Sequence, residues 1–218
     1  MSKAADFGAL RGSLTGQMLL PADSTYAECC KIFNAMHDKR PAVIARCSST
    51  ADVVAAVNFA RENDLVIAVR SGGHSVAGLS TCEGGMLIDL AGLKKIDIDP
   101  EASTARAGGG VLWGEFDAAT QQHGLHTPGG RVTTTGVGGF TTGGGYGWTS
   151  SKYGLTCDNL ISAEVVLADG RIVTASEHEK EGRLQVCKRP AIDTHSLRTP
   201  AANVDAVLDV LLEDLRKH

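Results

Sequence analysis

Short apolar runs alternate with amphipathic segments through the first part of the chain. Residues 41–45, 65–69 and 86–90 form three apolar runs of strand length. Between the first two, apolar residues from Val53 to Ala60 follow helical spacing, and residues 48–52 supply a helix start with acidic character. The pattern therefore predicts a strand, a helix and a second strand over 41–69, which is the usual connection between parallel strands.

The middle of the chain follows a different pattern. Residues 96–107 alternate around a turn and predict a hairpin, and residues 161–175 predict another around Ala168-Asp169-Gly170. Residues 111–122 carry helical spacing, whereas the glycine- and threonine-rich stretch 127–147 has little periodicity and is too long for a plain connector. Parallel signals followed by antiparallel ones predict an α+β fold.

Both ends of the chain favour helices. Residues 24–37 place apolar side chains three and four residues apart. Polar and charged residues dominate from 177 to 198, and Thr199-Pro200 then opens a predicted amphipathic helix over 200–217. The apolar stripe of such a helix is more often a packing surface than a ligand site.

Composition narrows the classes of function. The 218 residues carry 21 basic and 25 acidic side chains, with no block of like charge that would indicate nucleic acid or an acidic membrane surface as a partner. No apolar run approaches the length of a membrane helix or a signal peptide, so we expect a cytoplasmic protein. The six cysteines lack metal-ligand spacing, which favours reduced thiols over a disulfide framework and gives no reason to expect a metal.

Glycine is the compositional anomaly. The 26 glycines gather in three segments, 70–75, 127–130 and 136–147, and the first of these follows a predicted strand at its carboxyl end, where ligands bind in open α/β sheets. A single segment of this kind would more often be a tight turn. Three together favour close backbone approach to a ligand, with free N–H groups holding a pyrophosphate. Neither the dinucleotide fingerprint nor the phosphate loop ending in Gly-Lys-Ser/Thr occurs, so a long cofactor such as FAD fits best.

These segments also carry a resemblance. Residues 69–75 (VRSGGHS), followed in order by residues 108–110, 127–130, 136–147 and 152–160, resemble the p-cresol methylhydroxylase-type FAD-binding domain of FAD-linked oxidases similar to berberine bridge enzyme and 6-hydroxynicotine oxidase. The resemblance covers about residues 16–176. It implies a helical lead-in over 1–37, an FAD-binding domain of two subdomains over 38–177, and a divergent tail over 178–218.

The resemblance implies a two-lobed α+β module with FAD extended between the lobes. Residues 71–75 would hold the pyrophosphate, and His74 would be bonded to the 8α carbon of the flavin. The full set of cofactor-binding residues that it implies is Arg70, Ser71, Gly72, Gly73, His74, Ser75, Gly78, Pro128, Gly129, Gly130, Gly136, Gly138, Gly139, Thr142, Gly143, Gly144, Asp158 and Val165.

Chemistry agrees with a role for His74 as the attachment point. Neutral imidazole is a competent nucleophile near pH 7, and tautomerisation of the flavin makes its methyl carbon electrophilic. The alternative is a histidine that only forms hydrogen bonds within the loop. Some family members make a second bond through a cysteine just before the third glycine segment, but residues 130–135 contain none, so a single bond is expected. Cys157 is better interpreted as a buried thiol, and Asp158-Asn159 could equally be an ordinary turn.

Full-length oxidases of this type continue into a second domain that covers the flavin and supplies most substrate contacts. Residues 180–218 do not resemble that continuation. Two hypotheses follow. The chain represents an oxidoreductase that oxidises a small alcohol, sugar or amine by hydride transfer to flavin, with molecular oxygen as acceptor, or it is a flavin-binding module without turnover of its own. No catalytic residue can be named from the sequence.

Overall fold

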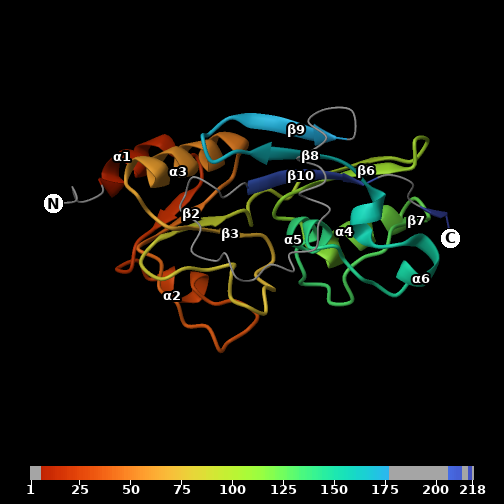
Figure 1. Ribbon diagram of the computed structural model, residues 1–218, viewed down its shortest axis with the longest axis horizontal. Helices are drawn as coiled ribbons and strands as arrows, with labels where there is room; N and C mark the ends of the chain where they lie inside the picture. Colours follow the sequence, from red (N-terminus) through yellow and green to blue (C-terminus); the bar gives the residue numbers. More distant parts are fainter. Residues whose placement is uncertain (1–5, 177–205, 213–215, 218) are drawn as a thin grey trace. The chain divides into compact units, whose positions relative to one another are not determined.

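The computed structural model describes residues 6–176, together with the backbone of residues 206–212 and 216–217 (Figure 1). These residues divide into two compact units. One contains residues 6–92 and 166–172, and the other contains residues 93–165, 173–176 and the last backbone segments from residue 207. The longest described helix has 13 residues, and no helix in the described parts is long and apolar enough to cross a membrane.

The first unit is built on a four-stranded sheet. Its order is β1 (Gln17–Leu19), β2 (Val43–Arg46), β4 (Met86–Asp89) and β3 (Ile67–Arg70). Strands β2 and β3 both run parallel to β4, and β1 runs antiparallel to β2. The predicted strand–helix–strand unit is confirmed, but β4 lies between its two strands. Val43, Ile44, Leu87 and Ile88 are completely buried, which explains their continuous apolar runs.

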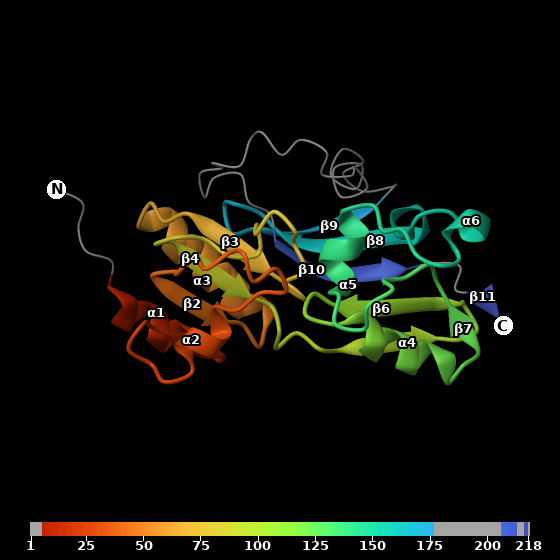
Figure 2. The same cartoon turned by 90° about the horizontal axis from the view of Figure 1, so that it is seen from below.

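Helix α3 (Thr50–Glu62) connects β2 to β3 and lies along this sheet (Figures 1 and 2). Ser49 caps it, because its hydroxyl accepts the backbone N–H of Asp52 at 3.2 Å. Asp52 itself is fully buried and accepts hydrogen bonds from the backbone of Thr15, Gly16 and Ser48 and from two hydroxyl groups. The start of α3 is thereby joined to the segment that precedes β1.

The predicted helix over 24–37 is wrong in its extent. Helix α1 covers Phe7–Ser13, and α2 covers only Tyr26–Cys29. Beyond α2 the chain turns toward the loop after β3: the N–H of Phe33 donates to the carbonyl of Gly73 at 3.1 Å, and the Asn34 amide donates to the carbonyl of Val76 at 2.8 Å. These bonds replace helical ones. Tyr26 and Cys30 of the expected apolar stripe are buried, but Phe33 and Met36 are 64% and 89% exposed and face no core.

A five-stranded sheet carries the antiparallel pairs. Its order is β5 (Ile96–Asp99), β6 (Thr104–Gly108), β10 (Ala206–Leu212), β8 (Leu160–Val166) and β9 (Ile172–Ser176). Both predicted hairpins, β5–β6 and β8–β9, are confirmed. With the parallel sheet, they confirm the α+β class. A small pair joins β7 (Leu125–His126) to β11 (Arg216–Lys217).

The amphipathic helix predicted over 200–217 is wrong where the backbone is described. Residues 206–212 form strand β10, which pairs antiparallel with β6 from Asp209 opposite Gly108 to Leu212 opposite Ala105. A strand edge offers unpaired N–H and C=O groups, and pairing with such an edge outweighs the local helical spacing of an apolar segment. The other residues of the predicted helix, 200–205 and 213–215, lie outside the described residues.

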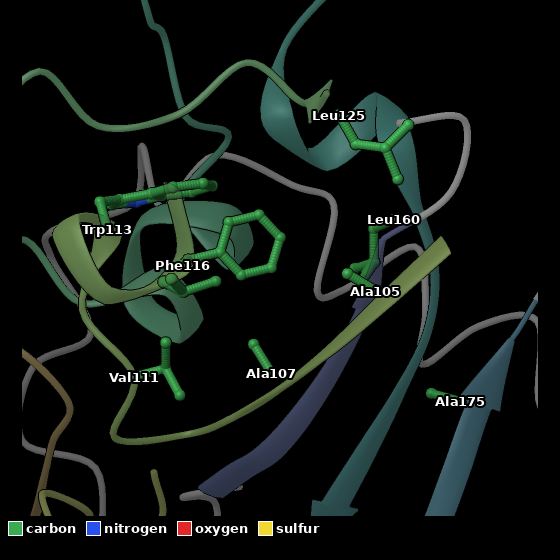
Figure 3. Close-up of a cluster of buried hydrophobic side chains, with 9 residues drawn as sticks. Ala105, Ala107, Val111, Trp113, Phe116, Leu125, Leu160 and Ala175 are labelled. Carbon is green, nitrogen blue, oxygen red and sulfur yellow. The ribbon is translucent and has the colours of Figure 1, made fainter. Parts of the chain in front are cut away.

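Helix α4 (Trp113–Gln121) packs on the core of the second unit. The predicted helix over 111–122 is confirmed. Trp113 and Phe116 are fully buried and meet edge to face, with ring centroids 5.3 Å apart (Figure 3). The stretch 127–147 contains a further short helix, α5 (Val137–Thr142), and is followed by α6 (Ser150–Tyr153) and the 3₁₀ helix Thr156–Asn159.

Candidate cofactor-binding site

Three charged side chains meet at the carboxyl edge of the parallel strands. Arg46, Asp89 and Arg70 are the last residues of β2, β4 and β3, and the register places Asp89 directly between the two arginines. Asp89 is 2% exposed. Its Oδ2 lies 2.9 Å from Nη2 of Arg70 and 3.3 Å from Nε of Arg46. A buried carboxylate needs such partners, because removal from water penalises an unpaired charge.

Arg70 is therefore held by the protein itself. Besides Asp89, its Nη1 donates to the carbonyl of Cys29 at 2.6 Å and to that of Lys31 at 3.4 Å. Sequence reasoning placed Arg70 among the cofactor ligands. In the structure its guanidinium fixes the base of the glycine loop by linking β3, β4 and the segment after α2.

The loop from Ser71 to Gly78 follows β3 and contains the first predicted binding segment. Gly73 and Gly78 have φ angles of +72° and +68°, a conformation that favours glycine. The hydroxyl of Ser71 is buried and has no hydrogen-bond partner in the described part of the chain. Buried hydroxyl groups are normally paired, so this one is free to donate to a ligand. A phosphate oxygen suits it, and the loop thus fits the expected cofactor.

Four residues of the preceding segment hold this loop: Phe33, Asn34, His37 and Lys39. The Phe33 N–H and the Asn34 amide bind the carbonyls of Gly73 and Val76, as described above. His37 Nε2 lies 2.9 Å from the same Val76 oxygen, and Lys39 Nζ donates to the carbonyl of Gly78 at 3.0 Å. Sequence reasoning missed these residues because the pattern favoured a helix there. Phe33 and Asn34 carry no recognisable motif of their own.

His74 lies half-buried on this loop. Its imidazole stacks on the ring of Phe33, with centroids 4.1 Å apart and planes inclined by 17°. Burial lowers the pKa of His74 below its ordinary value of 6.5, because removal from water disfavours the charged ring. The shift favours neutral imidazole near pH 7, and neutral imidazole is the nucleophilic form.

The second predicted segment, Pro128 to Gly130, is tightly packed in the other unit. A Cβ on Gly129 or Gly130 would lie 2.7 Å or 2.6 Å from the ring of Trp113, and Thr156 donates its hydroxyl to the carbonyl of Pro128 at 2.7 Å. These glycines are therefore required by the protein's own packing. Gly129 and Gly130 also line a cavity of about 250 Å³. The remaining lining residues are Asp117, Thr120, Gln121, Leu125, His126, Thr127, Trp148 and Thr149.

The third segment contains α5, and its glycines differ in their surroundings. Gly136 precedes the helix, Gly138 and Gly144 are buried, and Thr142 binds the carbonyl of Gly138 at 3.0 Å. A Cβ on Gly143 would lie 3.1 Å from the carbonyl oxygen of Gly139. By contrast, Gly139 is exposed, and a Cβ there would meet nothing within 4 Å. Packing does not explain a glycine at that position.

Two predicted cofactor positions, Asp158 and Val165, lie near the end of this unit. Asp158 is used locally, because its Oδ2 accepts the N–H of Leu155 at 2.8 Å at the start of the 3₁₀ helix. The turn interpretation of Asp158 therefore has direct support. Val165 is 3% exposed within β8, and Cys157 is buried at 3% exposure as expected. The structure brings residues 70–78 together in one unit and residues 128–144, 158 and 165 in the other.

Comparison with known proteins decides the family. Residues 41–176 match the family model described as "FAD binding domain". The chain belongs to this family. It is 38% identical over 168 residues to (R)-6-hydroxynicotine oxidase of Paenarthrobacter nicotinovorans, and 36% identical over 172 residues to an uncharacterised FAD-linked oxidoreductase, YvdP, of Bacillus subtilis. These matches cover 77% and 78% of this chain, but 37% and 38% of those relatives.

Solved structures agree with this membership. Crystalline 6-hydroxy-D-nicotine oxidase from Arthrobacter nicotinovorans superposes with a TM-score of 0.85 at 34% identity, covering 94% of this chain and 43% of that one. Xylooligosaccharide oxidase from Myceliophthora thermophila gives 0.85 at 28% identity, covering 96% and 43%. The predicted p-cresol methylhydroxylase-type fold is confirmed. The chain spans about two fifths of the length of these relatives.

Proposed function

We propose that this chain binds FAD through the Ser71–Ser75 loop and carries it on His74 by a single covalent bond. We further propose that it is the flavin-binding part of an oxidase, which oxidises a small alcohol, sugar or amine and uses molecular oxygen as acceptor. The observation that carries the proposal is the loop at the carboxyl end of β3. It combines a buried, unpartnered Ser71 hydroxyl with a half-buried histidine whose pKa is lowered by burial.

Bound flavin would accept a hydride from the substrate and pass two electrons to oxygen. The chain's own contribution is to bind and orient it. The Ser71 hydroxyl would donate to a pyrophosphate oxygen, and Arg70, held by Asp89, would keep the start of the loop in place. The glycine at position 139 leaves room for close approach of the cofactor to α5.

Attachment would use the imidazole of His74. A nitrogen of the imidazole would replace one hydrogen of the 8α-methyl group, and the imidazole would give up its N–H proton. Molecular oxygen, the oxidant in this proposal, would take up the two electrons and two protons released and leave as hydrogen peroxide. Lack of charge on His74 favours formation of the bond to the 8α carbon, because only neutral imidazole has a lone pair to form it.

The nature of the substrate rests on the relatives. The two similar solved structures are named for a hydroxynicotine, which is a cyclic amine, and for xylooligosaccharides. Residues 130–135 contain no cysteine, which supports attachment through one bond only. The alternative is a flavin-binding module without turnover of its own.

The test measures flavin before and after denaturation. Purified protein is incubated with FAD and oxygen, precipitated with acid, washed and examined for flavin fluorescence and for a modified His74 peptide. We expect fluorescence in the wild type and in His123→Ala, which changes an exposed histidine at the end of α4, and none in His74→Ala. Wild-type precipitate without flavin would refute the covalent bond.

Two further measurements complete this test. Ser71→Ala should weaken reversible FAD binding about 10- to 100-fold, the loss expected for a hydrogen bond to a charged group. Unchanged affinity would remove Ser71 from the site. Oxygen consumption with panels of amines, sugars and alcohols separates an oxidase from a module that only binds flavin.

A further inference from the structure

Phe33 is an unusual neighbour for the loop histidine. Its side chain is 64% exposed, yet its ring is stacked on His74 with a centroid distance of 4.1 Å. Its backbone N–H also binds the carbonyl of Gly73, the residue immediately before His74, at 3.1 Å. A single residue thus contacts the loop through both its main chain and its ring, and exposure of the ring shows that burial in a core is not its role.

Hydrogen bonds on both sides of His74 fix the backbone next to the stacked rings. The Asn34 amide binds the carbonyl of Val76 on the other side of His74, and His37 lies 2.9 Å from the same oxygen. The backbone is therefore tied at Gly73 and at Val76, with His74 between the two points. Within that frame, the stack with the Phe33 ring holds the imidazole in one plane.

We propose that Phe33 is a positioning residue, which holds the imidazole of His74 in the orientation needed to form its bond to flavin. This inference rests on the function proposed above. Phe33 forms no bond to the cofactor in the attachment step. It restricts the motion of the nucleophile, and prior orientation of a nucleophile raises the rate of a reaction that needs one approach direction. Removal of water from one face of the ring acts in the same sense, by favouring neutral imidazole.

The experiment separates the rate of attachment from the affinity for FAD. Protein without flavin is mixed with saturating FAD in aerated buffer, and acid-stable flavin is followed over time. Phe33→Leu keeps an apolar side chain but loses the ring, and we expect attachment to slow about 3- to 10-fold, the range of a stacked aromatic pair. Phe33→Tyr keeps the ring and should restore the wild-type rate.

Reversible FAD affinity is measured in parallel on the His74→Ala background, where no bond can form. There Phe33→Leu should leave the affinity unchanged within about twofold. Met36→Ala, which alters an apolar side chain 89% exposed in the same segment, is the matched control and should attach flavin at the wild-type rate.

The outcomes are distinct. Equal attachment rates in wild type and Phe33→Leu overturn the role of Phe33 and leave the proposed function intact. A slower rate that Phe33→Tyr does not restore, or an equal loss of affinity, shows a merely structural role and also overturns it. No acid-stable flavin on the wild type refutes covalent attachment itself, and the role of Phe33 falls with it.

Discussion

Asp89 should be the most sensitive position at the base of the loop. It is 2% exposed, and Arg70, whose side chain is 10% exposed, meets both of its oxygens, at 2.9 Å and 3.4 Å. Replacing Asp89 by Ala leaves the Arg70 guanidinium buried without its counter-charge. Loss of one partner from a buried pair costs about 3–5 kcal/mol of unfolding free energy. For a chain of this size, that corresponds to a melting temperature lower by about 6–20 °C.

Two variants make this prediction specific. Arg46 also touches Asp89, at 3.3 Å, but its side chain is 39% exposed, so Arg46→Ala should cost less than about 1 kcal/mol. The double variant Arg70→Met/Asp89→Leu removes both buried charges and should recover most of the stability that Asp89→Ala loses. Thermal unfolding followed by circular dichroism measures all three proteins under the same conditions.

Two outcomes would contradict the role of the buried Asp89–Arg70 pair. If Asp89→Ala and Arg46→Ala lower the melting temperature by the same small amount, the buried pair with Arg70 does not hold the loop. If the double variant is no more stable than Asp89→Ala, the cost lies in packing and not in the unpaired charge.

With Asp89→Asn, which keeps a similar shape, FAD affinity should also fall, because Arg70 loses its anchor.

Two further predictions concern stability. Burial raises the pKa of Asp52, but hydrogen bonds from Thr15 and Ser48 outweigh it and lower the pKa from 3.8 to about 2. About 2 kcal/mol of stability should therefore be present above pH 4 and be lost as the pH falls toward 2. Urea unfolding at pH 7 and pH 3 should show about half of this loss in wild type and in Asp97→Asn, an exposed control, and a smaller loss in Asp52→Asn. Gly78→Ala should destabilise the protein more than Gly84→Ala in thermal melts. Both glycines have positive φ, +68° and +65°, but a Cβ on Gly78 would lie 2.5 Å from the His37 ring, whereas one on Gly84 would meet nothing within 4 Å. Equal losses of stability would show that the His37 contact is unimportant.

Local patterns predicted most elements of the fold because their causes are local. The apolar runs that became β2 and β4 are buried on both faces, and β3 is buried at Ile67 and Ala68. The spacing of α3 and α4 follows a single buried stripe. The position of β4 between β2 and β3 could not be predicted in this way. It depends on pairing between residues that are far apart in sequence, which no local pattern records.

The two wrong helices share a cause of the same kind. Residues 30–37 have helical spacing, but their backbone and side chains bind the loop after β3. Residues 206–212 also have helical spacing, but their backbone completes a ladder with β6. In both segments, hydrogen bonds to a distant part of the chain replace those that a helix would supply internally.

The glycine motifs contain two kinds of residue that the sequence cannot distinguish. Gly129 and Gly130 are required because the Trp113 ring lies against them, and Gly147 because a Cβ there would lie 2.2 Å from the carbonyl oxygen of Gly129. Gly139 has no such neighbour, and glycine weakens a helix such as α5 by about 1 kcal/mol relative to alanine. We propose that close approach of the cofactor accounts for a glycine that costs stability and relieves no contact within the described chain. The strongest cofactor contact in the third segment is therefore expected at Gly139, where the packing of the described residues would accommodate a larger side chain.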